Sequence, residues 1–172
     1  MNLDYQQLLP ADFHPGSRVW IYQCNRLLGM GEVLQADQLL QQFVQQWQAH
    51  GEPVKGFATI FFGQFIILMA DAPQTGVSGC STDSSVRVIK QLEQQFGVTL
   101  FDRQLLAFVV KDKVQLIPIA QFRPAVENGL LPVNSLYFNN VVATKKELEE
   151  NWIIPITESW LKSRLPSGMS TI

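Results

Sequence analysis

The chain contains few charged residues and no cluster of basic ones. Only 16% of its 172 residues are Asp, Glu, Lys or Arg, whereas about 25% is usual for globular proteins. The 13 basic and 15 acidic residues give a net charge of −2. A nucleic-acid-binding surface needs clustered Lys and Arg, so we expect no nucleic-acid partner.

A long apolar run is also lacking. The longest, FATIFFGQFIILMA at residues 57–70, is interrupted by Gly63 and Gln64, and it is shorter than the roughly 20 residues that span a bilayer. The first residues, MNLDYQQLLPADF, include an acid and no basic region, unlike a secretory signal. We therefore expect a cytoplasmic protein with no membrane span.

Cysteine and histidine are scarce, with two of each: Cys24, Cys80, His14 and His50. Two cysteines do not make a disulfide framework. A zinc site needs three or four nitrogen or sulfur ligands at short spacings, which this chain does not offer. No G-x-x-x-x-G-K-[ST] sequence occurs, so the chain lacks the P-loop that binds ATP. We predict neither a metal nor a cofactor.

Apolar residues make up 47% of the chain, and their spacing predicts an α+β fold. Strand-like runs and helical periodicity alternate in the order strand, helix, strand, strand, helix, strand. The predicted strands are 18–23, 57–62, 65–70 and 105–110, and the predicted helices are 32–50 and 83–96. This order is that of a ferredoxin-like (split βαβ) antiparallel sheet.

The same reading divides the chain into three parts. Residues 1–17 show no sustained period and are read as an N-terminal extension, and residues 18–119 as the α+β core domain. Residues 120–172 form a C-terminal α/β extension packed on the core. Within it, Thr144 and Glu147 have the spacing of a capping box, which predicts a helix at 145–151.

The predicted hairpin strands are apolar on both faces. Phe57 and Ile67 cannot face the same way as Ile60 and Leu68, because side chains alternate along a strand. Burying each large side chain is worth about 1.5–3 kcal/mol, so both faces should be covered. We expect either the C-terminal extension or a second copy of the chain, as a homodimer, to cover the second face.

The stretch SGCSTDSSV at 78–86 is the candidate reactive site. A thiolate is favoured at a helix N-terminus, which makes Cys80 and Asp83 candidate catalytic residues. The surrounding loop residues are candidate anion ligands: Ser78, Gly79, Ser81, Thr82, Ser84 and Ser85. In the alternative interpretation, Asp83 or Ser84 is the N-cap of the helix and Cys80 packs as a small apolar side chain.

A second candidate site follows from the predicted topology. Arg26, Asp102 and Arg103 should share one sheet edge, and the two arginines could bind a small anion. The alternative is a solvated ion-pair cluster. Cys24 lies at that edge and Cys80 at the opposite one, about 20 Å away across a six-residue strand, so the two should not form a disulfide.

Three segments carry a family resemblance. They are RVWIYQCNR at 18–26, SGCSTDSSVRVIKQLEQQFGVTLFDR at 78–103 and LYFNNVVATKKELEENWIIPITESW at 136–160. The chain resembles an uncharacterised bacterial protein family whose members are sometimes labelled "ABC transporter ATPase". The resemblance implies no established activity and assigns no functional residue. The label finds no support in these residues, since they contain no P-loop, and we treat it as a misannotation.

The sequence by itself favours a non-catalytic cytoplasmic binding domain that self-associates and takes an unidentified protein or small-molecule ligand. Two alternatives stay open. One is a thiol-dependent enzyme or redox sensor that uses Cys80, and the other is a small-anion or nucleotide binder at the 76–85 loop. The helix at 31–50, whose only charges are Glu32 and Asp37, is typical of an interaction surface, although glutamine is also simply a good helix former.

Overall fold

The chain folds into two compact units of mixed helix and antiparallel sheet. The computed structural model describes residues 1–71 and 79–168, and for residues 79–83 it describes the backbone alone. The larger unit contains Asp4–Phe101 and Asn140–Glu149, and the smaller unit contains Met1–Leu3, Asp102–Asn139 and Glu150–Ile172. The predicted α+β class is confirmed.

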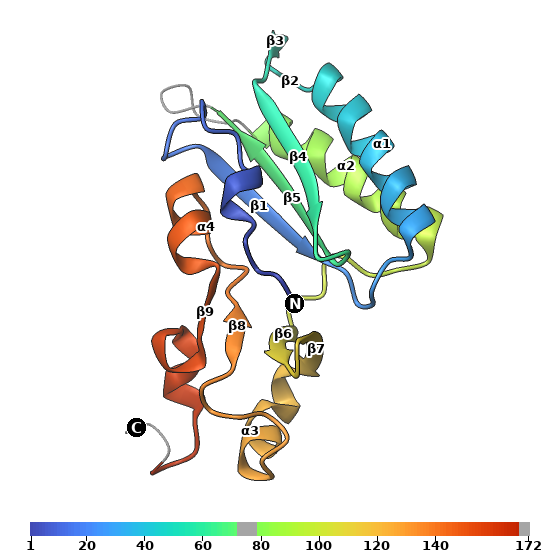
Figure 1. The fold of residues 1–172 in the computed structure, drawn as a ribbon. Helices are drawn as coiled ribbons and strands as arrows, with labels where there is room; N and C mark the ends of the chain where they lie inside the picture. The colour runs from blue at the N-terminus through green and yellow to red at the C-terminus, as the bar shows by residue number, and fades with distance from the viewer. Residues whose placement is uncertain (72–78, 169–172) are drawn as a thin grey trace. The chain divides into compact units, whose positions relative to one another are not determined.

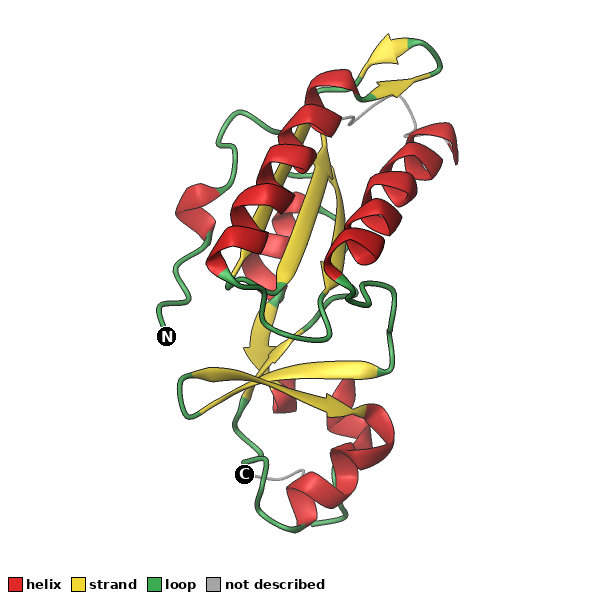
Figure 2. Ribbon diagram, turned by 90° about the vertical axis from the view of Figure 1, so that its right-hand side faces the viewer, coloured by secondary structure: helices red, strands yellow, loops and turns green. Residues whose placement is uncertain are grey.

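The larger unit is built on a three-stranded antiparallel sheet with the strand order β1-β5-β4. Two helices, α1 and α2, lie side by side on one face of this sheet (Figures 1 and 2). The elements are η1 (Gln6–Leu8), β1 (Arg18–Gln23), α1 (Met30–Gln46), β2 (Gln48–Ala49), β3 (Glu52–Pro53), β4 (Gly56–Phe61), β5 (Phe65–Ala70) and α2 (Gly79–Phe96).

The predicted ends of helices and strands agree with the structure where the apolar pattern ends sharply, and they differ from it where a turn follows. The predicted strand at 18–23 is β1, with the same bounds. The predicted helix at 32–50 ends at Gln46, because Trp47 adopts an extended backbone and β2 follows. His50 and Gly51, both with positive φ, form the turn between β2 and β3. The hairpin of β4 and β5 turns at Phe62 and Gly63, which also have positive φ, as a tight hairpin turn requires.

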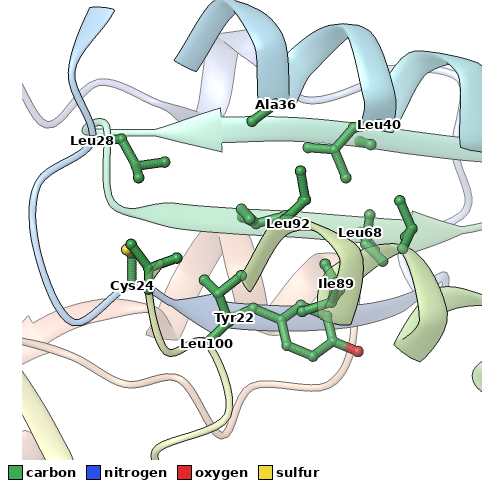
Figure 3. Packing of buried hydrophobic residues seen from close by; sticks show 13 residues of the cluster. Tyr22, Cys24, Leu28, Ala36, Leu40, Leu68, Ile89, Leu92 and Leu100 are labelled. Atoms are coloured by element: carbon green, nitrogen blue, oxygen red, sulfur yellow. The ribbon is translucent and has the colours of Figure 1, made fainter. Parts of the chain in front are cut away.

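The face of the sheet under α1 and α2 holds the first hydrophobic core. Tyr22 and Leu68 from the strands pack with Leu40 of α1 and with Ile89 and Leu92 of α2 (Figure 3). All five side chains are at most 9% exposed. At about 1.5–3 kcal/mol for each large apolar side chain, this layer is a main source of stability for the larger unit.

The N-terminal extension covers the opposite face of the sheet. The ring of Tyr5 lies 5.6 Å from that of Phe61, and the ring of Phe13 lies 6.5 Å from that of Phe57. Tyr5 and Phe13 are 2% and 7% exposed. The prediction that both faces are covered is therefore right. The expected cover was incomplete, because it did not include the N-terminal extension, whose residues 4–17 belong to the larger unit.

Residues 140–149 hold the N-terminal extension in place. The Tyr5 hydroxyl donates a hydrogen bond to the Leu148 carbonyl, and Lys145 Nζ donates one to the Phe13 carbonyl at 3.2 Å. Burial, together with the nearby Glu149 carboxylate, raises the pKa of Tyr5 to about 12. The predicted capping box is present: Glu147 N donates to Thr144 Oγ1, and Thr144 N donates to Glu147 Oε2, both at 3.2 Å.

The smaller unit has a four-stranded antiparallel sheet with the order β7-β6-β8-β9. Its core includes Phe108 and Phe122, whose rings stack 5.8 Å apart, and Tyr137. Its elements are β6 (Leu105–Val110), β7 (Lys113–Pro118), α3 (Ile119–Glu127), β8 (Leu136–Phe138), β9 (Ile153–Pro155), η2 (Ile156–Glu158) and η3 (Trp160–Arg164). Helix α4 (Lys145–Asn151) begins in the 140–149 segment of the larger unit.

The ferredoxin-like sheet is not confirmed. The strand expected to complete it, at 105–110, is β6, and β6 pairs with β7 and β8 in the smaller unit. Beside β1 the structure has instead a bridge between Arg18 and Thr144. The compact units accordingly do not follow the expected divisions at residues 17 and 119. In the described part of the chain, no helix is long and apolar enough to cross a membrane.

Candidate functional site

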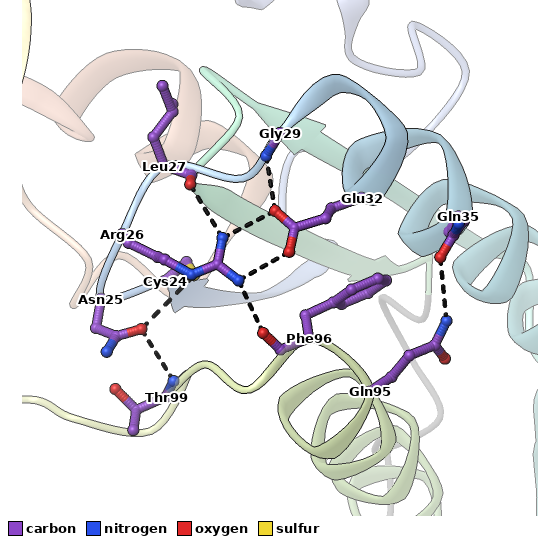
Figure 4. A network of polar contacts seen from close by, with 10 residues as sticks. All are labelled: Cys24, Asn25, Arg26, Leu27, Gly29, Glu32, Gln35, Gln95, Phe96 and Thr99. Carbon is purple, nitrogen blue, oxygen red and sulfur yellow. Dashed lines mark hydrogen bonds and ion pairs between the residues drawn. The ribbon is translucent and has the colours of Figure 1, made fainter.

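Arg26, a predicted anion ligand, is already engaged by neighbouring groups. Its two terminal nitrogens donate to the two carboxylate oxygens of Glu32, each at 2.8 Å, and Nη2 also donates to the Phe96 carbonyl at 2.8 Å (Figure 4). Arg26 and the backbone N–H of Gly29 lower the pKa of Glu32 to about 2. This network ties the start of α1 to the end of α2 and leaves little of Arg26 for an anion.

Arg103, the other predicted arginine, is exposed and belongs to the smaller unit, whereas Arg26 belongs to the larger one. Neither unit by itself contains the predicted pair. Near Arg26, Asn25 exchanges two hydrogen bonds with Thr99: Thr99 N donates to Asn25 Oδ1 at 3.0 Å, and Asn25 N donates to the Thr99 carbonyl at 3.1 Å. The geometry at this edge is therefore that of a structural anchor.

Cys24 is a free cysteine with no exposed surface. Burial raises the pKa of its thiol, so the neutral form is favoured. A neutral, inaccessible thiol is a poor nucleophile. Cys24 accordingly contributes to the core of the larger unit and not to a reactive site.

Most side chains of the 78–86 stretch lie outside the described part of the chain. Ser78 falls outside it altogether, and so do the side chains of Cys80, Ser81, Thr82 and Asp83. The backbone shows that α2 begins at Gly79, so Asp83 and Ser84 are helical residues and the N-cap assignment was wrong. A reactive Cys80 stays a prediction.

Of the two serines on α2 whose side chains are described, Ser85 has no exposed surface and faces the core. Ser84 is half-buried. It lines an open groove of about 380 Å³ between the C-terminal half of α1 and the middle of α2. The other lining residues are Leu39, Gln42, Phe43, Gln46, Trp47, Gln48, Arg87, Val88 and Gln91.

Aromatic rings form the base of this α1–α2 groove. The rings of Phe43 and Trp47 lie 4.9 Å apart, and Trp20 of β1 lies 5.8 Å from Trp47 on the sheet side. Gly56 of β4 makes room for the Trp47 ring, since a Cβ there would lie 2.7 Å from Trp47 Cε3. The groove therefore has a firm apolar floor that is fixed by contacts with the sheet.

The rim of the α1–α2 groove is polar and almost uncharged. Among the lining residues whose side chains are described, Gln42, Gln46, Gln48 and Gln91 supply primary amides, and Arg87 is the only charged one. Arg87 is exposed, and no carboxylate within residues 1–71 and 84–168 forms an ion pair with it.

The chemistry of the described lining residues suits binding. They include no Asp, Glu, His or Cys, and these side chains are the usual general acids, bases and nucleophiles. The described residues also contain no group of three or more His, Cys, Asp or Glu that could hold a metal ion.

Sequence reasoning missed Phe43, Trp47 and Arg87 as site residues. The available signal was the glutamine-rich, charge-poor segment at 31–50, which supplies one wall of the groove. The opposite wall comes from α2, and the pairing of the two walls is a property of the fold. Comparisons of the chain with protein families, curated proteins and solved structures found no match.

Proposed function

We propose that the chain is a non-catalytic cytoplasmic binding domain that takes its ligand in the α1–α2 groove and that self-associates. The observation that carries the binding role is the groove itself, with its aromatic floor, its rim of glutamine amides and no acid, base or nucleophile among its described lining residues. A volume of about 380 Å³ lies within the usual range for ligand sites, about 300–1,000 Å³.

Blocking the groove tests the binding role. Gln42→Trp places a large ring in the lining, whereas Gln45→Trp places the same ring on an exposed position of α1 outside the lining. A library of small polar and aromatic compounds is screened by backbone amide NMR. We expect hits that shift groove signals in the wild type and in Gln45→Trp but not in Gln42→Trp. Hits that map elsewhere, or that survive Gln42→Trp, would contradict the proposal.

Self-association is supported by apolar side chains exposed at the start of α1. Leu27, Met30 and Leu34 are 66%, 81% and 61% exposed. The charges beside them, Arg26 and Glu32, already neutralise each other. A surface that is apolar and carries no unpaired charge costs little to desolvate, and such surfaces commonly mark protein interfaces.

Sedimentation velocity measures the self-association. We expect the wild type to form dimers at micromolar to millimolar concentrations and Leu34→Glu to weaken the dimer strongly. Gln38→Glu introduces the same charge one turn further along α1, at an exposed polar position, and should leave the dimer intact. A wild type that remains monomeric throughout would refute this part of the proposal.

A further inference from the structure

We infer that the ligand of the α1–α2 groove is an extended polypeptide segment with a carboxylate that pairs with Arg87. This inference rests on the proposed binding role of the groove and names the class of its ligand. Three features of the described lining carry it: a cation, Arg87, with no ion pair to a carboxylate within residues 1–71 and 84–168, a rim of primary amides, and an apolar floor.

The charge of the lining points to a singly charged anionic group. Arg87 is the only cation among the lining residues that the structure describes. Phosphate groups are generally recognised by clusters of arginines and nucleic acids by clustered Lys and Arg, and the described lining residues contain neither kind of cluster. One guanidinium matches one carboxylate, because its planar donors form two parallel hydrogen bonds to the two oxygens.

The amides of the rim match a polypeptide backbone. Each glutamine side chain offers a carbonyl acceptor and an NH₂ donor on the same group. A backbone in extended conformation presents N–H donors and C=O acceptors along both of its edges. Gln42 and Gln46 lie one turn apart on α1, and Gln91 lies across the groove on α2. Both edges of a bound segment therefore have partners.

The apolar floor supplies a contact for a side chain of the ligand. Leu39 and Phe43 of α1 face Val88 of α2 in the lining. An apolar side chain of the ligand that packs there gains about 25 cal/mol for each Å² removed from water. Apolar burial would provide most of the affinity, and the Arg87 pair would select for an acidic ligand.

Three short peptides test the inference on the full-length chain by backbone amide NMR. Acetyl-Leu-Glu-Leu-amide carries an internal carboxylate, acetyl-Leu-Gln-Leu carries only a free C-terminal carboxylate, and acetyl-Leu-Gln-Leu-amide is neutral. Because a partly exposed ion pair is worth up to about 1 kcal/mol, we expect one or both acidic peptides to bind the groove about fivefold more tightly than the neutral one. The tighter of the two identifies the source of the carboxylate.

Two variants with the same charge change provide the control. Arg87→Gln should abolish the preference for the acidic peptides, whereas Lys90→Gln, at an exposed position of α2 outside the lining, should retain it. Equal binding of all three peptides in the groove would overturn the inference and leave the binding role intact. A preference that persists in Arg87→Gln would also overturn it, as would no groove shifts from any peptide at about 10 mM. The binding role itself is decided separately, by the Gln42→Trp screen.

Discussion

Replacing Gly56 by Ala tests whether the floor of the α1–α2 groove is fixed by packing against β4. A Cβ at this position would lie 2.7 Å from Trp47 Cε3 and 3.2 Å from Trp47 Cζ3, whereas carbon atoms in contact are about 3.5–4.0 Å apart. The Trp47 ring cannot move away freely, because Phe43 and Trp20 contact it.

The magnitude follows from two opposing terms. Overpacking of this kind costs about 1–3 kcal/mol. Replacing a glycine that does not need positive φ by alanine stabilises the folded state by about 0.4–1 kcal/mol, because it lowers the conformational entropy of the unfolded chain. We therefore expect Gly56→Ala to lower the free energy of unfolding by about 1–2 kcal/mol, measured by urea unfolding with tryptophan fluorescence.

Two further variants make the reasoning refutable. Gly31 of α1 is exposed, and a Cβ there meets nothing within 4 Å, so Gly31→Ala should raise stability by up to about 1 kcal/mol. In a Trp47→Leu background the clash is absent, so Gly56→Ala should cost nothing there, which a double-mutant cycle detects. A wild-type-like Gly56→Ala, or the same cost in both backgrounds, would refute the steric argument.

Three other predictions concern the cover of the sheet, the helix anchor and the thiols. Phe13→Ala should cost about 3 kcal/mol of unfolding free energy in urea, because it removes a buried ring from the second face of the sheet, whereas Leu8→Ala, at a position 64% exposed, should cost little. The pKa of Glu32 is lowered from 4.5 to about 2 in the folded state, so its carboxylate stabilises the fold above pH 4.5 and this contribution is lost as the pH falls toward 2. Glu32→Gln should therefore make the urea unfolding midpoint less dependent on pH between about 2 and 4.5. The same pH dependence in Glu32→Gln and wild type would contradict this role of Glu32. In the native protein, Cys24 should resist alkylation until the chain unfolds. In Cys24→Ser, where Cys80 is the remaining thiol, the pH dependence of alkylation should have a midpoint near the ordinary thiol pKa of about 8.5. A much lower midpoint would favour the thiol-enzyme alternative.

Local chemistry made several elements predictable. The strand at 105–110 matches β6 residue for residue, because an uninterrupted apolar run ends at the charged turn Lys111–Lys113. The Thr144 and Glu147 capping box depends only on a three-residue spacing, and the structure contains both of its hydrogen bonds. The argument that both faces of the hairpin are covered also held, because it needs only the alternation of side chains along a strand.

Partner choice was not predictable from the pattern. The apolar pattern of a strand does not say which sheet it joins. From the order of the elements alone, residues 105–110 were assigned to the sheet of the larger unit, whereas they pair in the sheet of the smaller unit. The cover of the second face was also misplaced, because Tyr5 and Phe13 are too widely spaced to show a helical or strand period. Within the C-terminal extension, Trp152 and Trp160 instead pack on Phe138 and Tyr137 of the smaller unit.

The amino-acid sequence determined which segments become helix or strand and which of their faces must be buried. These depend on backbone propensity and on apolar periodicity, and both act over a few residues. Only the tertiary structure decided that residues 4–17 cover the sheet and that Arg26 bonds to Glu32 and to the end of α2. It also decided that Arg87 and the four glutamines line one groove. Each of these depends on contacts between residues far apart in the chain, and no local pattern encodes such contacts.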